Sequence, residues 1–381
     1  MLSVLLIAAT AVRPGAASAR AFARLRLDAT CHVGPHKTGS TTIQDAILGE
    51  WRDSLVEEDG FDIPPRPAVH ARRTAHDARR SVAYARAAFA LRTAARLGAS
   101  EPWRWLVEHI RSAAAAGKRL VITAEGLSLL RGSRAGIVPR VLLSAGYAPK
   151  VVIVYRRLFE RIPSWHSERW LKHAVPVRRY APIVDWVAAN GTRETAPKNL
   201  YGQTVALRDV YVALGLEVFV LNMHAIPNGS SLESQFVCEY MRAERTCARM
   251  LAAHRERRSG AERKNTNSRN TANLFDVAYS TAASHGMRGR LIPDRFVEAL
   301  GLALHGRALP MRCVDEPTYA AIWQATAQEE HTLNPAGLDE ARVRFAASRP
   351  HFCSVDTTKL ALDVTLQQRV ERAFASATAE A

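Results

Sequence analysis

Four short apolar runs, separated by longer stretches of helical periodicity, dominate the pattern of this chain. The runs cover Leu27–Val33, Leu120–Thr123, Val151–Tyr155 and Val218–Leu221. Each is shorter than a typical helix and apolar at consecutive positions, which indicates a strand buried on both faces. Because strands that alternate with helices form a parallel sheet covered on both sides, we expect a three-layer α/β/α fold around a central parallel sheet.

The pattern changes along the chain. After about residue 270 it becomes mostly helical, and it ends in an amphipathic stretch near 360–377. Residues 66–98 are rich in Ala and Arg and have a helical pattern, which we interpret as an insertion. The chain shows no internal repeat and no low-complexity linker. We therefore expect one domain over 27–381, with a mostly helical C-terminal part over 270–381.

Residues 1–26 stand apart from this domain. Residues 2–12 are apolar but too few to span a bilayer, and Ala17-Ser18-Ala19 has the form of a signal-peptidase site. We expect entry into the secretory pathway and a location in the Golgi lumen. Because residues 1–26 contain arginines and no acid, an organellar transit peptide stays open, as does a cytoplasmic protein with a disordered tail. No other segment predicts a transmembrane span.

The cysteines suggest two disulfides. Cys238 and Cys247 flank a short polar segment with a helical pattern and could pair in an oxidising lumen, and Cys313 with Cys353 is a second candidate pair. Cys31 lies in a predicted buried strand, which indicates a small core residue. Since the cysteines lack the spacing of zinc sites, we expect no structural metal.

The net charge of the chain suggests a class of partner. The chain has 52 Lys and Arg residues against 36 Asp and Glu, which gives a formal net charge of +16. This excess suggests an anionic partner, such as a nucleic acid, a phosphate-bearing cofactor, an acidic glycan or a membrane surface. A solvated basic surface is the plainer explanation, and composition does not decide between them.

The segment after the first predicted strand has the strongest chemical signal. It reads GPHKTGSTT over residues 34–42 and opens a predicted helix. A helix N-terminus presents unpaired N–H groups and the positive end of a dipole. The hydroxyl side chains add donors and Lys37 adds a positive charge. This combination predicts an anion-binding loop of the P-loop kind, and with it a P-loop-like fold.

The loop departs from the nucleoside-triphosphate motif. That motif, GxxxxGK[ST], places its lysine after the second glycine, whereas Lys37 precedes Gly39. A kinase or ATPase would also use an acid near a strand end to hold magnesium. The run Val151–Tyr155 is followed by Arg156 and Arg157 instead, which argues against metal-assisted phosphoryl transfer.

Arg156 and Ser164 form a second candidate anion site. Arg156 follows a predicted strand at the edge where open α/β sheets bind ligands, and Ser164 lies eight residues further on, along the next predicted helix. An arginine and a hydroxyl so placed can bracket one phosphate. We expect Arg161, between them, to pair or stack within the fold. Two anion sites together imply a ligand with separate phosphate groups.

The order, separation and internal spacing of these two motifs resemble those of the sulfotransferase family. The GPHKTGSTT stretch resembles its 5′-phosphosulfate-binding loop, with Ser40 where threonine is commoner, and the Arg156…Ser164 pair resembles its 3′-phosphate-binding motif. The likeness spans roughly residues 27–225 and is greatest to the carbohydrate-type, bacterial and algal branch. Residues 262–268 loosely resemble a loop that closes over the nucleotide in such enzymes.

The resemblance implies transfer of a sulfuryl group from 3′-phosphoadenosine 5′-phosphosulfate (PAPS) to an acceptor hydroxyl, without a metal. By motif position, Lys37 would neutralise the charge on the bridging oxygen and the leaving phosphate. The 5′-phosphate would be bound by Gly34, Lys37, Thr38, Gly39, Ser40, Thr41 and Thr42. The 3′-phosphate would be bound by Arg156 and Ser164.

The acceptor hydroxyl also needs a base. Glu125 follows the run Leu120–Thr123 on the ligand edge of the sheet, and glycan sulfotransferases commonly use a glutamate near such a position. Glu125 is therefore the first candidate base, and a helix-start acid stabilised by the dipole is the alternative explanation. His36, beside Lys37, is the second candidate.

For the acceptor we expect a carbohydrate, and the basic 66–98 segment favours an anionic glycan. Trp165, Trp170, Arg178 and Arg179 follow the second motif and could line an acceptor wall, although tryptophans more often pack helices. The alternatives are a P-loop nucleotide kinase or ATPase and a non-catalytic basic protein that binds nucleotides or nucleic acid. Because the chain contains no recognised DNA- or RNA-reading motif, we expect no nucleic-acid partner.

Overall fold

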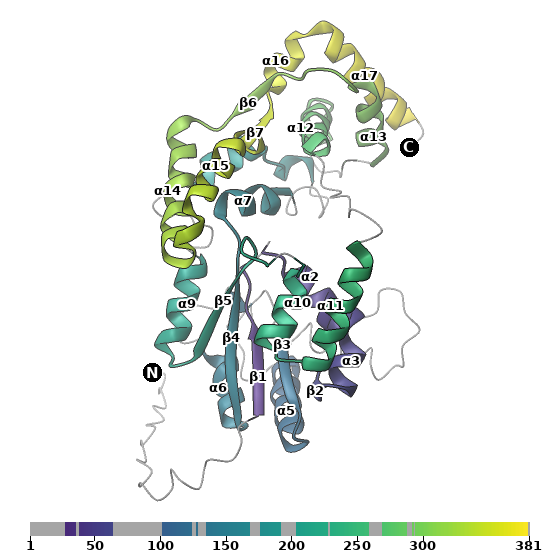
Figure 1. Cartoon of the computed structure of the whole chain (residues 1–381). Coiled ribbons are helices and arrows are strands. Elements are labelled where there is room, and N and C mark those ends of the chain that lie inside the picture. Colours follow the sequence, from purple (N-terminus) through teal and green to yellow (C-terminus); the bar gives the residue numbers. More distant parts are fainter. Residues whose placement is uncertain are drawn as a thin grey trace, which may run out of the picture.

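In the computed structural model, a five-stranded parallel sheet forms the centre of the fold (Figure 1). Its strands are β1 (Leu27–His32), β2 (Phe61–Asp62), β3 (Arg119–Thr123), β4 (Tyr147–Tyr155) and β5 (Glu217–Asn222). They lie in the order β2-β3-β1-β4-β5. The four predicted strands and the α/β class are confirmed. The short strand β2 was missed, because a two-residue strand leaves no periodic signal in the sequence.

The structure describes most of the chain after residue 26. The described residues are 27–35, 38–63, 101–123, 127–128, 135–167, 176–191, 203–227, 229–258, 269–287, 292 and 294–379. The N-terminal segment 1–26, the predicted insertion 66–98 and the loop 262–268 lie outside them. Among the described residues, no helix is both long and apolar enough to cross a membrane.

Helices cover both faces of the sheet and complete the three predicted layers. One face is covered by α5 (Glu101–Ala115), α6 (Ile137–Ser144) and α9 (Gln203–Ala213). The other is covered by α2 (Ser40–Asp45), the π-helix η1 (Ala46–Glu50), α3 (Arg52–Glu57), α10 (Leu232–Gln235), the π-helix η7 (Phe236–Tyr240) and α11 (Glu244–Arg258). Alternate residues of β4 take part in the two cores: Val151 and Ile153 in one, Val152 and Val154 in the other. This alternation explains why the strand is apolar at consecutive positions.

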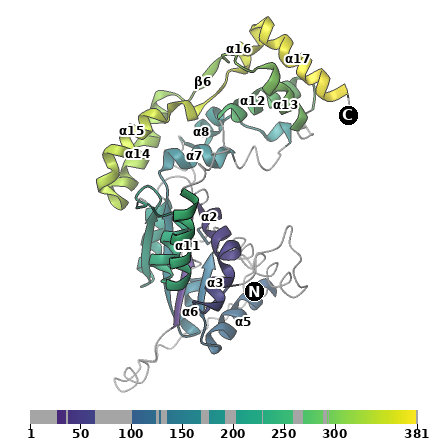
Figure 2. The same ribbon diagram turned by 45° about the vertical axis from the view of Figure 1, so that its right-hand side comes forward.

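A helical region stands over the carboxyl edge of the sheet (Figures 1 and 2). Its helices are α7 (Leu158–Ser167), α8 (Ile183–Gly191), α12 (Arg269–Ser284), α13 (Asp294–Ala303), α14 (Glu316–Leu333), α15 (Leu338–Ala347), α16 (Thr357–Leu362) and α17 (Val364–Ala379). The helical C-terminal region is thus confirmed, and it packs together with α7 and α8 from the middle of the chain. Helices α7, α8, α14 and α15 share one core, while α12, α13, α16 and α17 share another.

Two disulfides join neighbouring elements. Cys238–Cys247 joins η7 to α11, and Cys313–Cys353 joins the antiparallel strands β6 (Met311–Cys313) and β7 (Cys353–Val355), in which the two cysteines are register partners. Both candidate pairs from the sequence are therefore disulfides in the structure. Cys31 is buried in the sheet core, and burial raises its pKa to about 12, as fits the predicted small core residue.

Candidate functional site

The two segments predicted to bind anions follow neighbouring strands, β1 and β4. From β1 the chain turns toward β2 and β3 on one side of the sheet, and from β4 it proceeds to β5 on the other side. Open α/β sheets bind ligands outside the carboxyl ends of their strands, at the point where the connections diverge in this way. The loop at 34–42 and the start of α7 therefore flank the topological switch point of the sheet.

Register places the two strand ends close together. His32, the last residue of β1, pairs with Val152 of β4, and the backbone N–H of Val33 donates to the carbonyl oxygen of Val152 at 2.8 Å. Strand β4 then continues to Tyr155 before Arg156 follows. The loop after β1 therefore begins beside the last residues of β4.

The turn from β1 into α2 is partly described, and both His36 and Lys37 lie outside the described residues. Gly34 and Pro35 before them are buried. Thr38 after them is fully buried, and its hydroxyl donates to the carbonyl oxygen of Pro35 at 2.8 Å. The Thr38 hydroxyl thus closes the loop on itself.

Gly39 connects this loop to α2. Its φ of +83° lies in the left-handed region that favours glycine, and an added Cβ would overlap Cδ2 of Leu232 in α10. Ser40 and Thr41 then open α2, which confirms the predicted hydroxyl-rich helix start, although the structure does not describe their side chains. Thr42, the third hydroxyl residue, is exposed.

The second motif has the strand, turn and helix that the sequence predicts. Arg156 follows β4 directly, and Ser164 lies half-buried in α7. The Nε atom of Arg156 is 3.7 Å from Oε2 of Glu160, one helical turn further on. The Arg156 side chain is 25% exposed, so part of it reaches solvent at the switch point although its Nε atom is buried.

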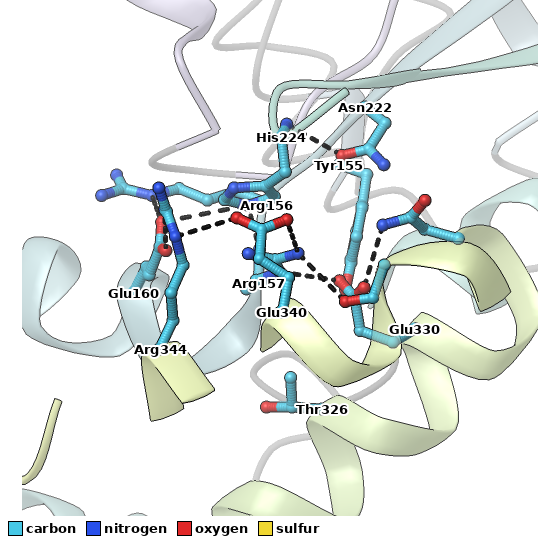
Figure 3. Close-up of polar contacts among 12 residues, drawn as sticks. Tyr155, Arg156, Arg157, Glu160, Asn222, His224, Thr326, Glu330, Glu340 and Arg344 are labelled. Carbon is cyan, nitrogen blue, oxygen red and sulfur yellow. Dashed lines mark hydrogen bonds and ion pairs between the residues drawn. The ribbon is translucent and has the colours of Figure 1, made fainter. Parts of the chain in front are cut away.

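Arg157, its neighbour, points into the protein and binds the helical region (Figure 3). Its side chain is fully buried, with Nε 3.2 Å from Glu330 Oε1 and Nη2 3.2 Å from Glu340 Oε2. The hydroxyl of Tyr155 donates to the same Glu330 oxygen at 2.6 Å. The two arginines after β4 therefore differ in environment: Arg156 is accessible, whereas Arg157 attaches the strand end to α14 and α15.

Arg161 is also internal, as the sequence led us to expect. Its side chain is buried, and the nearby Glu329 carboxylate on α14 is its main opposite charge. Burial lowers the pKa of Arg161 and raises the pKa of Glu329. Glu329 in turn accepts the backbone N–H of Thr204 at 3.1 Å, which ties α14 to the start of α9.

His224 lies just beyond β5 on the same edge and was missed from the sequence. Its Nε2 accepts the backbone N–H of Arg157 at 3.1 Å, so the neutral ring carries its proton on Nδ1. Burial, together with the positive charges of Arg157, Arg344 and Arg156, lowers the pKa of His224 to about 3. The signal that could have found it is its position after a predicted strand, at the edge where ligands bind.

Both candidate bases, Glu125 and His36, lie outside the described residues, but the strand ends that lead to them are described. Nδ1 of His32 and Oγ1 of Thr123 are hydrogen-bonded at 2.8 Å, and both side chains are buried. Because Thr123 ends β3, the segment that contains Glu125 begins beside the loop that contains Lys37.

The residues proposed for an acceptor wall have different environments. The rings of Trp165 and Trp186 meet edge to face at 6.2 Å, so Trp165 packs α7 against α8, the commoner use of a tryptophan. Arg178 and Arg179 are exposed on the short 3-10 helix η6 (Val177–Arg179). Trp170 lies outside the described residues.

Within the described ranges, no group of three or more His, Cys, Asp or Glu residues could hold a metal ion. Comparisons of the chain with protein-family models, curated proteins and solved structures found no significant match. A functional assignment therefore has to rest on the motifs and on the geometry of the sheet edge.

Proposed function

We propose that the chain is a PAPS-dependent sulfotransferase that transfers a sulfuryl group to a hydroxyl of a carbohydrate acceptor. One observation carries this proposal: the GPHKTGSTT loop and the Arg156–Ser164 segment follow adjacent parallel strands at the topological switch point. Such a position is where open α/β sheets bind nucleotides. In a nucleotide with a 5′-phosphate and a 3′-phosphate, the 5′-phosphate would bind the loop and the 3′-phosphate would bind the Arg156–Ser164 segment.

Each group has a distinct part in the proposed reaction. The acceptor oxygen attacks sulfur, the bond from sulfur to the bridging oxygen breaks, and the nucleotide leaves with a terminal phosphate. Lys37 and the backbone N–H groups of the loop would stabilise the charge that develops on this phosphate. Glu125, or His36 in its place, would take the acceptor proton. Arg156 would hold the 3′-phosphate and so orient the donor.

Binding calorimetry tests the nucleotide class. We expect 3′-phosphoadenosine 5′-phosphate (PAP), the product nucleotide, to bind at least tenfold more tightly than 5′-AMP, because only PAP has a phosphate for Arg156. ATP with magnesium is the comparison that represents the kinase alternative. Equal affinity for PAP and 5′-AMP, or a preference for ATP with magnesium, would refute the sulfotransferase proposal.

Sulfuryl transfer from labelled PAPS to a panel of neutral and acidic glycans tests the reaction. We expect Lys37→Ala to reduce transfer on the order of 10²-fold, since removal of one group that stabilises developing charge has about this effect. The matched control is Lys118→Ala, because Lys118 is exposed at the opposite, amino edge of the sheet. Full activity in the Lys37 variant would contradict its assigned role.

A glycine pair tests whether the loop after β1 is the nucleotide site. Gly39 and Gly60 have similar φ values, +83° and +72°, but only Gly39 belongs to the loop; an added Cβ at Gly60 meets nothing within 4 Å. Gly39→Ala and Gly60→Ala should each cost about 1–2 kcal/mol of stability from backbone strain, and Gly39→Ala also requires the Leu232 side chain to shift. Only Gly39→Ala should weaken PAP binding by tenfold or more. Unchanged affinity in that variant would exclude the loop as the phosphate site.

We also propose that the protein matures in the secretory pathway and acts in an oxidising lumen such as the Golgi. The two disulfides support this, because such bonds are uncommon in reducing compartments. The net charge of +16 and the exposed Arg178 and Arg179 support an anionic glycan as the acceptor.

A further inference from the structure

Glu160 holds two arginines that come from distant parts of the chain (Figure 3). Its Oε2 is 3.7 Å from Nε of Arg156 at the end of β4, and its Oε1 is 3.2 Å from Nη1 of Arg344 on α15. Because both guanidinium groups reach the oxygens of one carboxylate, they converge on one small volume. A phosphate presents its oxygens to guanidinium groups in much the same way as a carboxylate does.

Arg344 is both accessible and oriented. Its side chain is 53% exposed, whereas that of Arg157 is fully buried, so Arg344 can meet a ligand from solvent and Arg157 cannot. Its Nε is 3.1 Å from Oε1 of Glu340, one turn earlier on α15. Glu340 also binds Arg157, so the base of the Arg344 side chain is attached to the same network that fixes the end of β4.

The described network around Glu160 pairs the arginines Arg156, Arg157 and Arg344 with the glutamates Glu160, Glu330 and Glu340. His224 Nε2 lies 3.9 Å from Oε2 of Glu160, yet burial and then the neighbouring arginines lower the pKa of His224 and keep the ring neutral. An anion that binds both Arg156 and Arg344 would therefore take the place of Glu160 between the two guanidinium groups.

We propose that Arg344 is a further ligand of the anion that Arg156 binds, so that α15 contributes a residue to the 3′-phosphate site. This rests on the proposed function. Without nucleotide, Glu160 stands between the two guanidinium groups as an internal counter-ion. When the 3′-phosphate enters, Arg156 and Arg344 bind its oxygens, and Glu160 moves to the outer side of the pair.

A purely structural role for Arg344 makes a different prediction. In a purely structural role, the Arg344–Glu160 ion pair would contribute little to stability, and its loss would leave nucleotide affinity unchanged. Nucleotide discrimination therefore separates the two roles, because only a phosphate ligand distinguishes PAP from 5′-AMP.

The test compares Arg344→Gln with Arg342→Gln, which removes another exposed arginine from the same helix. Calorimetry measures PAP and 5′-AMP binding to both variants of the full chain, and thermal unfolding confirms that each is folded. We expect Arg344→Gln to weaken PAP binding at least tenfold and to change 5′-AMP binding less than twofold. Arg342→Gln should change neither, and Arg344→Lys, which keeps the charge, should bind PAP with intermediate affinity.

The outcomes separate this inference from the function on which it rests. If the unaltered protein prefers PAP and Arg344→Gln behaves like Arg342→Gln, the role of Arg344 is refuted while the sulfotransferase proposal stands. If Arg344→Gln weakens PAP and 5′-AMP equally, Arg344 does not contact the 3′-phosphate, and the inference also fails. If the unaltered protein shows no preference for PAP, the proposed function fails and the inference falls with it.

Discussion

Replacement of Glu330 by alanine would remove the carboxylate that joins the sheet edge to α14. The Glu330 side chain is fully buried. It accepts hydrogen bonds from the Tyr155 hydroxyl at 2.6 Å, from Arg157 Nε at 3.2 Å and from Asn334 Nδ2 at 3.0 Å. Alanine would leave the Arg157 guanidinium buried with Glu340 as its remaining carboxylate, and the Tyr155 hydroxyl without its acceptor.

The expected cost follows from these contacts. Removal of one partner of a buried ion pair costs about 3–5 kcal/mol, because the other charge stays buried with less compensation; Arg157 would keep only the half-exposed Glu340. Unfolding entropy of about 2.1 cal/mol/K per residue gives ~0.8 kcal/mol/K for a chain of 381 residues. Glu330→Ala should therefore lower the melting temperature by about 4–6 °C, measured by calorimetry or circular dichroism.

The control lies on the same helix. Glu316 pairs with Arg349 at 3.5 Å, but its side chain is 80% exposed, so Glu316→Ala should change stability by less than about 1 kcal/mol. The double variant Arg157→Met/Glu330→Met removes both charges and should recover most of the stability that Glu330→Ala loses. A melting temperature of Glu330→Ala within 1 °C of the unaltered protein would refute this reasoning, as would a double variant less stable than Glu330→Ala.

Three further predictions concern pH and redox state. Burial raises the pKa of Asp276 from 3.8 to about 6, so its contribution to stability is greatest below pH 4 and is lost as pH rises through 6. In Asp276→Asn, the free energy of unfolding should therefore depend less on pH between 4 and 6. An unchanged slope of that free energy against pH would contradict this. Burial and nearby arginines lower the pKa of His224 from 6.5 to about 3, so its contribution to stability is present above pH 6.5 and is lost as pH falls toward 3. In His224→Gln, the free energy of unfolding should fall less steeply with decreasing pH. A pH profile identical to that of the unaltered protein would contradict this. Cys313 and Cys353 are 40 residues apart, and the cysteines that join η7 to α11 are 9 apart, so chain entropy predicts that these disulfides stabilise the fold by about 4 and about 2.6 kcal/mol. Urea unfolding of the two double serine variants should show the larger loss of stability for Cys313→Ser/Cys353→Ser. The reverse order would refute the entropic argument.

The sheet was predictable because burial on both faces leaves a strong trace. Every residue of Val151–Tyr155 is buried, and each contributes to one of the two helical layers or to the network at the strand end. Strand β2, with only Phe61 and Asp62, has no such trace and is a strand because β3 pairs with it. The same holds for β6 and β7, whose pairing depends on contacts between segments far apart in the sequence.

The candidate site was predictable only in outline. Arg156 and Arg157 are chemically identical and adjacent, and the sequence does not tell which one faces solvent. The partner that decides it, Glu330, comes 173 residues after Arg157. One trace does exist in α14, where Glu329 and Glu330 follow Tyr319, Ile322 and Thr326 at helical spacing on the buried face. Two acids on an apolar helix face indicate buried cationic partners elsewhere in the fold.

The late position of α14 has a consequence for synthesis of the protein. Strand β5 ends at Asn222, so all five strands of the sheet have left the ribosome long before α14 and its two glutamates are made. Until then, Arg157 and Arg161 lack the α14 carboxylates that neutralise them in the folded protein. A nascent chain can therefore form its sheet early, as N-terminal segments commonly do, yet completes the carboxyl edge only when its C-terminal helices emerge. A chain interrupted before α14 would contain the five-stranded sheet and both proposed phosphate-binding segments, but not the glutamates of α14 that pair with Arg157 and Arg161.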